Sequence, residues 1–296
     1  MNRAEERRVT NRIEAARREG RNPLSLAHLS MIDVDHLTLI KAAEAGGFDG
    51  VGLRIVAPPH TPLVREILRN RQFIAEVKAA LRETGIAVSD VETFALRPDT
   101  RVADYRAGLE LAADLGAAYV MTSGVDPDPE RTHDNFLELC DLAAEFGLSI
   151  GVEFIAFREL RTLAEAQALV ERSGRANAGI VIDALHLSRS GGNPDQVASL
   201  PADRVAFVQL CDAVARLPAF DDLAYEARND RLLPGDGSLW LGDLVKALPD
   251  GRVLGIEAPT RALAGLDPLE RGRRIGARSR EFLRTLDNDP NPGHSR

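Results

Sequence analysis

Short apolar runs recur along this chain at a regular spacing, and this repetition constrains the fold more than any other feature of the sequence. From Pro23 onward the runs alternate with amphipathic stretches, and each run except the last returns after roughly 25 to 35 residues, the length of one βα unit. The runs cover residues 24–29, 50–53, 86–91, 119–122, 149–154, 179–183, 206–210 and 254–257. Eight such runs predict a parallel sheet that closes into a single (β/α)8 TIM barrel, a fold of the α/β class.

Helix-like segments separate these runs. They cover residues 33–45, 73–84, 104–115, 132–146, 163–173 and 268–286. Gly46, Gly85, Gly116 and Gly147 stand at the ends of four segments, and glycine can adopt the left-handed cap conformation without a steric penalty. Each glycine precedes the next strand run by a few residues, so these connections have the length that a βα barrel requires.

The domain organisation follows from the same pattern. Residues 23–286 form one predicted barrel domain. Residues 1–22 are a charged extension, expected to include a partly ordered helix outside the barrel, and residues 287–296 are expected to be a disordered tail. One connection is long, because residues 211–237 separate the seventh run from a helix predicted at 239–248. Such a loop is expected to cover the mouth of the barrel as a lid.

Composition excludes several classes of protein. The formal net charge is −8 and the basic residues are scattered along predicted helices, which disfavours nucleic-acid binding. No apolar run approaches the roughly 20 residues of a membrane span, so no membrane contact is expected. The two cysteines, Cys140 and Cys211, form no disulfide or zinc-finger pattern, which fits a reducing, cytoplasmic setting. The sequence leaves open whether the chain forms a homo-oligomer.

Four polar residues stand at the carboxyl ends of the last four predicted strands: Glu153, Asp183, Gln209 and Glu257. In a parallel barrel these positions converge on one mouth, whereas a carboxylate inside the packed layers is costly. Three crowded carboxylates raise one another's pKa unless a cation lies among them, so we predict that the four residues bind one divalent metal. Oxygen ligands favour Mn²⁺ or Mg²⁺, with Co²⁺ or Zn²⁺ as alternatives. The competing interpretation is four isolated polar residues bonded to loop backbone.

Other side chains near the strand ends are candidates for substrate binding. His186 is either a substrate contact or a structural hydrogen bonder. Five arginines follow the ligand-bearing strands or lie in the long connection: Arg158, Arg189, Arg216, Arg228 and Arg231. A guanidinium can hold a substrate carboxylate or phosphate, and we predict this role for Arg228 first and for Arg216 as well. Alternatively, these arginines are solvated or paired with acidic residues of the same segment: Asp221, Asp222, Glu226 and Asp230. Three further residues are candidates for specificity: His28, Arg54 and Glu92.

These residues resemble those of the xylose-isomerase-like metal barrels, a superfamily of sugar isomerases, ketose 3-epimerases, inosose dehydratases and 3-dehydroshikimate dehydratases. The resemblance covers residues 24 to about 286. Its motifs are Gly-Phe-Asp-Gly-Val at 47–51, Val-Glu-Phe at 152–154, Ile-Asp-Ala-Leu-His at 182–186, Val-Gln-Leu-Cys-Asp at 208–212 and Arg-Leu-Leu-Pro-Gly-Asp-Gly at 231–237. By position, the resemblance implies that Glu153, Asp183, Gln209 and Glu257 are metal ligands and that His186 binds substrate.

Gln209 is a departure from much of the superfamily. Most of the epimerases have histidine at this position, whereas glutamine resembles the bacterial 3-dehydroshikimate dehydratases, as do residues 183–186 and the loop with Arg228 and Arg231. A neutral amide ligand does not by itself determine the chemistry. The chain lacks the many histidines of the trinuclear-zinc endonucleases that share this fold.

The chemistry that the resemblance implies is proton abstraction next to a metal-bound carbonyl, with Glu153 and Glu257 as catalytic base and acid. The first hypothesis is therefore a divalent-metal-dependent isomerase or epimerase of a small keto-sugar or keto-polyol. If a β-hydroxyl is lost, the same first step leads to a dehydratase of the 3-dehydroshikimate or inosose type. The third hypothesis is a non-catalytic binding protein on the same barrel, against which the four intact ligand positions argue.

Overall fold

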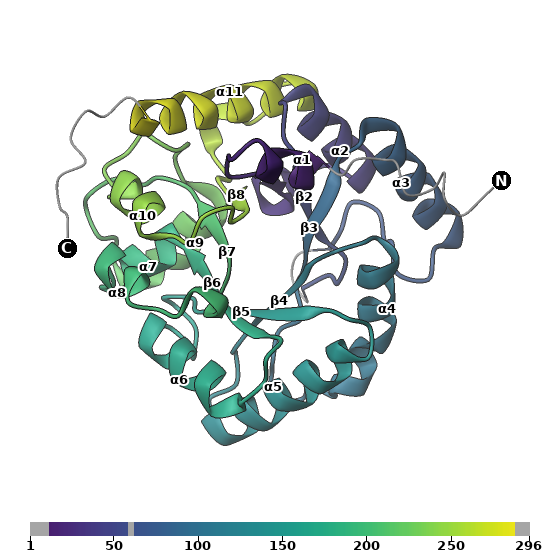
Figure 1. Cartoon of the computed structure of the whole chain (residues 1–296), viewed down its shortest axis with the longest axis vertical. Coiled ribbons are helices and arrows are strands. Elements are labelled where there is room, and N and C mark those ends of the chain that lie inside the picture. Colours follow the sequence, from purple (N-terminus) through teal and green to yellow (C-terminus); the bar gives the residue numbers. More distant parts are fainter. Residues whose placement is uncertain (1–11, 59–61, 288–296) are drawn as a thin grey trace.

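The eight apolar runs form eight parallel strands in the computed structural model, which describes residues 12–58 and 62–287. The strands are β1 (Leu24–Ala27), β2 (Gly50–Arg54), β3 (Ala87–Glu92), β4 (Tyr119–Ser123), β5 (Ser149–Glu153), β6 (Ala178–Asp183), β7 (Val205–Leu210) and β8 (Leu254–Ile256). They pair in chain order, and β8 pairs with β1, so the sheet is a closed barrel. The predicted TIM barrel is confirmed (Figure 1).

Helices surround the strands as an outer ring (Figure 1). The α-helices are α1 (Arg12–Arg18), α2 (His36–Ala45), α3 (Arg71–Thr84), α4 (Arg106–Asp114), α5 (Pro129–Ala144), α6 (Leu163–Ser173), α7 (Ala184–Arg189), α8 (Pro194–Ala198), α9 (Phe220–Asn229), α10 (Leu241–Ala247) and α11 (Pro268–Asp287). Short 3-10 turns are η2 (His28–Met31), η3 (Val102–Tyr105), η4 (Ala202–Arg204) and η5 (Arg261–Leu263). No helix among the described residues is long and apolar enough to cross a membrane.

Local signals in the sequence explain the bounds of individual helices. At the start of α6 the Thr162 side chain accepts a hydrogen bond from the Glu165 backbone N–H, and the Glu165 carboxylate accepts one from the Thr162 backbone. This reciprocal capping satisfies two backbone donors that have no partner within the helix. The helix ends at Gly174, whose φ of 61° is strained for any side chain but costs glycine little. The structure therefore has α6 where the sequence predicts it.

The long connection after β7 differs from the expected loop, because it contains helix α9. The buried face of α9 includes Leu223, Ala227 and the charged Glu226. Glu226 is buried because the Arg189 guanidinium bonds both of its carboxylate oxygens, at 2.6 and 2.9 Å. A hydrophobic pattern does not detect a helix whose inner face contains a charge that a residue distant in sequence compensates.

Helix α1 lies within the predicted extension, residues 1–22. Its Ile13 is buried and packs with Ala87, the first residue of β3, and Val253, which precedes β8. These residues mark the amino ends of the strands, so α1 lies at the end of the barrel opposite the mouth. Residues 1–11 lie outside the described part of the chain. So does the predicted tail, apart from Asp287 at the end of α11.

Helices α2 and α11 approach each other so closely that glycine is required at their contact. A Cβ atom on Gly272 would collide with the backbone carbonyl oxygen of Ala42, and one on Gly276 with that of Gly46. Because α2 belongs to the first βα unit and α11 to the last, this contact closes the outer ring of helices just as the β8–β1 pairing closes the inner ring of strands (Figure 1).

Candidate metal and substrate site

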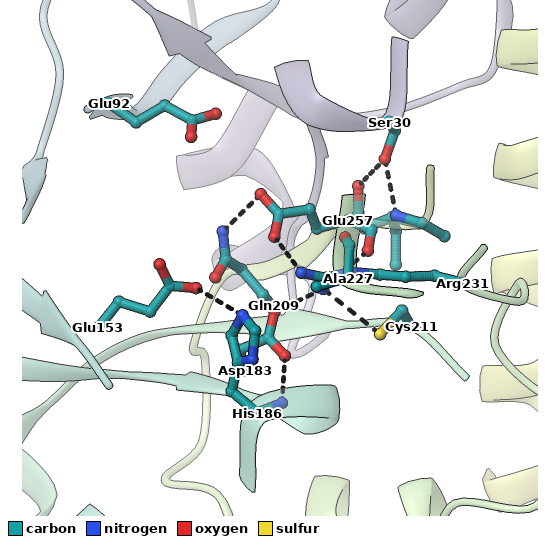
Figure 2. A network of polar contacts seen from close by, with 12 residues as sticks. Ser30, Glu92, Glu153, Asp183, His186, Gln209, Cys211, Ala227, Arg231 and Glu257 are labelled. Carbon is teal, nitrogen blue, oxygen red and sulfur yellow. Dashed lines mark hydrogen bonds and ion pairs between the residues drawn. The ribbon is translucent and has the colours of Figure 1, made fainter. Parts of the chain in front are cut away.

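The four predicted metal ligands lie at one end of four adjacent strands. Glu153 ends β5 and Asp183 ends β6, while Gln209 is the second-last residue of β7 and Glu257 directly follows β8. Their exposed fractions are 5%, 0%, 2% and 2% in that order. Asp183 and Gln209 are register partners across β6 and β7, so their side chains start from the same level of the barrel. The structure therefore gathers all four at the carboxyl end of the barrel (Figure 2).

Asp183 occupies a strand end and a helix cap at the same time. Its Oδ1 atom accepts a hydrogen bond of 2.9 Å from the backbone N–H of His186, in the first turn of α7. This bond fixes the carboxylate and brings the His186 side chain to the same mouth. Ligand atoms of Glu153, Asp183 and His186 all lie within 4.8 Å of one another, a spacing at which one metal ion can bind all three.

Gln209 and Glu257 form a second contact in the same network. The Gln209 Nε2 atom donates a hydrogen bond of 3.0 Å to Glu257 Oε1 (Figure 2). This orientation leaves the Gln209 Oε1 atom buried and without a hydrogen-bond partner. An unsatisfied buried carbonyl oxygen costs free energy, and a cation is one partner that satisfies it.

Arg231 is the residue that links the acids. Its Nη1 atom lies 2.6 Å from Asp183 Oδ2, and its Nη2 atom lies 3.2 Å from Glu257 Oε2. The Nε atom donates at 2.7 Å to the carbonyl oxygen of Ala227, near the end of α9. With an exposed fraction of 1%, Arg231 is not the surface arginine that the sequence suggests but part of the interior of the site (Figure 2).

The segment that contains Arg231 folds back onto the end of β7. Asp212, two residues after the end of β7, forms a backbone bridge with Leu232, and its carboxylate accepts hydrogen bonds from the backbone N–H groups of Gly235 and Leu239. A Cβ atom on Gly237 would collide with Asp212, so this position requires glycine. The Pro-Gly-Asp-Gly motif is therefore a turn that holds Arg231 beneath the mouth.

The buried charges of this region do not cancel. Four carboxylates, those of Glu92, Glu153, Asp183 and Glu257, are buried around the mouth. Two buried guanidinium groups face them: Arg231, and Arg54, which lies 2.8 Å from Glu92. When all four carboxyls are ionised, four negative charges face two positive ones, and one divalent cation balances the difference of two.

Burial and the neighbouring charges also shift the pKa values of the carboxyl groups at the mouth. Burial, and then the negative charges of Glu257 and Asp183, raise the pKa of Glu153 well above its ordinary value. Burial raises the pKa of Glu257 to about 8. Burial also acts to raise the pKa of Asp183, but the Arg231 guanidinium and His186 outweigh it and hold that pKa below its ordinary value. Without a further cation, Glu153 and Glu257 therefore tend to keep protons, whereas Asp183 stays ionised.

A cavity of about 480 Å³ opens above these residues. Glu153, Glu257 and His186 line it, whereas Asp183 and Gln209 lie beneath its surface and are not among its lining residues. This volume lies within the range of small-molecule sites. The cavity is therefore large enough for a substrate of the size of a sugar.

The predicted substrate-binding residues fall in two places. His186 and Arg228 line the cavity, while Arg216 is exposed in the connection between β7 and α9 and is not among the lining residues. Burial lowers the pKa of His186 to about 4, so its imidazole is neutral at physiological pH. Two of the three predicted substrate contacts thus share the mouth with Glu153 and Glu257.

Among the candidate specificity residues, Arg54 and Glu92 line the cavity as a buried ion pair. His28 instead has a structural role, because its Nδ1 atom accepts a hydrogen bond from the Arg54 backbone N–H. The sequence reasoning missed the position of Arg231 between two of the acids. The signal that marks it is the glycine-rich motif of residues 231–237, in which only Arg231 carries a positive charge.

Comparison with known proteins identifies the family to which the chain is similar. The model of the Xylose isomerase-like TIM barrel family matches residues 39–286. The 3-dehydroshikimate dehydratase of Pseudomonas aeruginosa is 34% identical over 191 residues, which cover 59% of this chain and 30% of that protein. The inosose isomerase of Bacillus subtilis is 23% identical over 159 residues, which cover 50% of this chain and 55% of that protein. The chain thus spans about a third to about half of the length of these relatives.

Solved structures have the same fold. The IOLI protein, whose crystal structure includes a bound zinc atom, superposes with a TM-score of 0.73 at 17% identity and covers 91% of this chain and 99% of its own. The 3-keto-D-glucoside 4-epimerase YcjR of E. coli superposes with a TM-score of 0.65 at 18% identity, over 90% of this chain and 100% of its own. Relatives named as a dehydratase and an isomerase indicate a family of enzymes. With a barrel of matching topology and a family model that covers most of its length, the chain belongs to the Xylose isomerase-like TIM barrel family.

Proposed function

We propose that this chain is a divalent-metal-dependent isomerase or epimerase that removes a proton next to the carbonyl group of a small keto-sugar or keto-polyol. The observation that carries the proposal is the pair of buried carboxyl groups, Glu153 and Glu257, which line one cavity from β5 and from the end of β8. The two carboxyl groups face the same cavity from different strands, so one can take a proton from the substrate while the other returns one.

The residues present fit a divalent cation. The unpartnered Oε1 atom of Gln209, the spacing of Glu153, Asp183 and His186, and the excess of two negative charges all support this. Glu153, Asp183, Gln209 and Glu257 are the proposed ligands, and the oxygen-rich donor set favours Mn²⁺ or Mg²⁺, with Co²⁺ or Zn²⁺ as alternatives. When bound, such an ion polarises a substrate carbonyl and acidifies the adjacent C–H bond.

The side chains of this chain account for the proton transfers. One of the two glutamates, ionised, takes the proton from the carbon next to the carbonyl group, and the other, protonated, returns a proton to the substrate. His186 is neutral, and its Nε2 atom lies 4.0 Å from Glu153 Oε1. It is therefore placed to hold a substrate hydroxyl close to this glutamate without adding charge.

The test is incorporation of solvent deuterium into a panel of ketoses and keto-polyols, followed by NMR with Mn²⁺ present. Exchange at the carbon next to the carbonyl group is expected, and a chelator should abolish it. Glu153→Gln and Glu257→Gln should each lower the rate by about 10²- to 10⁴-fold, the usual contribution of a positioned acid or base. Glu138→Gln, an exposed position on α5, is the matched control and should leave the rate unchanged.

Two results would contradict the proposal. Exchange that survives both glutamine substitutions would remove these carboxyls from the proton transfers. Absence of exchange with every compound, together with tight binding of a polyol ketone, would favour a non-catalytic binding protein.

A second candidate function is dehydration of a 3-dehydroshikimate type of substrate. Gln209, where most epimerases of the superfamily have histidine, and the relatives named 3-dehydroshikimate dehydratase favour it. In this reaction the C–H bond next to the carbonyl group breaks, its electron pair forms a C=C bond, and the β-hydroxyl leaves with the proton of the second glutamic acid as water.

Incubation with 3-dehydroshikimate and Mn²⁺ separates the two functions. A dehydratase turns this compound into an aromatic product with a new ultraviolet band, whereas an isomerase or epimerase exchanges its proton without that band. Glu138→Gln again serves as control, because a loss of signal in that variant would point to damage unrelated to the site.

A further inference from the structure

Three arginines from three different connections line the mouth cavity: Arg97, Arg158 and Arg228. Arg97 follows β3, Arg158 follows β5, and Arg228 belongs to α9. We call this group the arginine rim. Positive side chains that converge from distant parts of the chain repel one another, so their shared position needs a physical reason.

Two acids close to the rim in sequence have other partners. Glu159, next to Arg158 in sequence, faces Arg161 at 4.0 Å. On α9, Glu226 is bound by Arg189. Within residues 12–58 and 62–287, the guanidinium groups of the arginine rim take part in no ion pair, so three positive charges face the cavity without an acidic partner.

The aromatic ring of Phe157 supports two members of the rim. The guanidinium carbons of Arg158 and Arg228 lie 5.6 and 5.4 Å from the centre of this ring, within the range of cation–π contacts. The ring holds both groups over the cavity but does not cancel their charge. Burial, and then the charges of Arg228 and Arg97, lower the pKa of Arg158, as expected for cations brought together out of water.

The rim lies beside the acidic part of the site. The Phe157 ring also contacts the His186 ring, at 5.6 Å between centres, and His186 in turn faces Glu153. The cavity therefore has carboxyl groups at its base and guanidinium groups on one side. A small molecule with an anionic group at one end and a carbonyl group at the other matches this distribution of charge.

We propose that Arg97, Arg158 and Arg228 form an anion subsite that binds a carboxylate or phosphate group of the substrate and directs its carbonyl end toward Glu153 and Glu257. Guanidinium groups bind both anions through paired N–H donors, so the chemistry is shared by the two sources. The direction toward Glu153 and Glu257 rests on the proposed function, whereas anion binding by the rim does not.

The test is calorimetric titration of the metal-loaded protein with matched pairs of compounds at fixed ionic strength. Shikimate is compared with its neutral methyl ester, and fructose 6-phosphate with fructose. The anionic member of at least one pair should bind about tenfold or more tightly, because hydrogen bonds to charged groups are the strong ones. The pair with the larger preference identifies the anion as carboxylate or phosphate.

Substitutions in the arginine rim test whether the rim causes the preference for the anionic compound. Arg158→Gln with Arg228→Gln should remove it, and Arg97→Gln should reduce it. Arg101→Gln is the matched control, since Arg101 is an exposed arginine of the same connection as Arg97 and does not line the cavity. It should keep the preference. Unchanged melting temperatures in all variants exclude loss of folding as the cause.

The possible results distinguish a failure of the anion subsite from a failure of the proposed catalytic function. Equal binding of the anionic and neutral members of both pairs, or a preference that survives Arg158→Gln with Arg228→Gln, would overturn the anion subsite. A preference that depends on the rim, combined with a failure of deuterium exchange in every compound, would retain the subsite and remove the proposed catalytic function.

Discussion

The Arg231 guanidinium lies 2.6 Å from the Asp183 carboxylate, and neither side chain is more than 2% exposed. Breaking a buried ion pair on one side leaves the other charge without compensation, which costs more than the pair itself contributes. Asp183 is also the N-cap of α7 and a proposed metal ligand, so the geometry of the site depends on this pair.

Arg231→Met is expected to lower the free energy of unfolding by about 3–5 kcal/mol in the metal-free protein. The reason is that Asp183 and Glu257 then remain buried without their guanidinium partner. Adding Asp183→Asn should recover part of the loss, because the uncompensated charge is removed. Urea denaturation of both variants measures the effect, and equal destabilisation of the single and the double variant would speak against the ion pair as its source.

Gln209→Leu is expected to weaken metal binding by at least about tenfold, a loss typical of disturbed metal sites. The leucine removes the amide oxygen that has no partner in the structure but keeps the bulk of the side chain. Competition with a chelator of known affinity measures the dissociation constant of Mn²⁺ directly, without any need for turnover. An unchanged constant would exclude Gln209 as a ligand.

The metal-free protein is expected to lose stability as the pH rises from about 5 to 8. Burial raises the pKa of Glu257 from 4.5 to about 8, so between these values the folded state keeps a proton that the unfolded state has released. The folded state then binds more protons than the unfolded state, and the free energy of unfolding falls with rising pH. Melting temperatures recorded in the presence of a chelator check the trend.

Two controls locate the source of this pH dependence. Glu257→Gln should reduce the slope, because the amide does not titrate, while Glu153, whose pKa is also raised, keeps part of it. A saturating divalent metal should reduce the slope as well, since the ion favours the charged carboxylates. A slope that is unchanged both in Glu257→Gln and with the metal bound would assign the effect to other groups.

Gly272→Ala is expected to destabilise the protein by about 1–3 kcal/mol, the usual cost of overpacking. The added methyl group would collide with the Ala42 carbonyl oxygen, and backbone in α2 cannot move as a flexible side chain would. Gly242→Ala in α10 is the matched control, because only the end of the Leu286 side chain lies near and alanine favours helices. Thermal unfolding should therefore show a loss for the first variant and none for the second.

The barrel could be predicted from the sequence because its signal is repeated eight times. Every predicted strand overlaps an observed one, and the bounds differ by a few residues at most. Helix α9 could not be predicted in the same way, since Glu226 interrupts its apolar face and its partner Arg189 belongs to another element. A pattern along the chain does not contain contacts of this kind.

The candidate site, too, could be predicted from the sequence only in part. The convergence of Glu153, Asp183, Gln209 and Glu257 follows from strand order alone, and it was predicted. The role of Arg231 depends on how its segment folds back around Asp212, which no local rule gives. The identity of the metal, the cytoplasmic setting, the homo-oligomer and the role of Arg216 stay predictions.

The Arg231 side chain connects the acids at the strand ends with helix α9. Arg231 bonds Asp183 and Glu257 with one end of its guanidinium and, through Nε, the Ala227 carbonyl oxygen near the end of α9. Helix α9 also contains Arg228, which lines the cavity, so the helix at the entrance is joined by one hydrogen bond to the guanidinium that bonds the acids below. The position of α9 at the entrance and the orientation of the acids are therefore coupled through a single side chain.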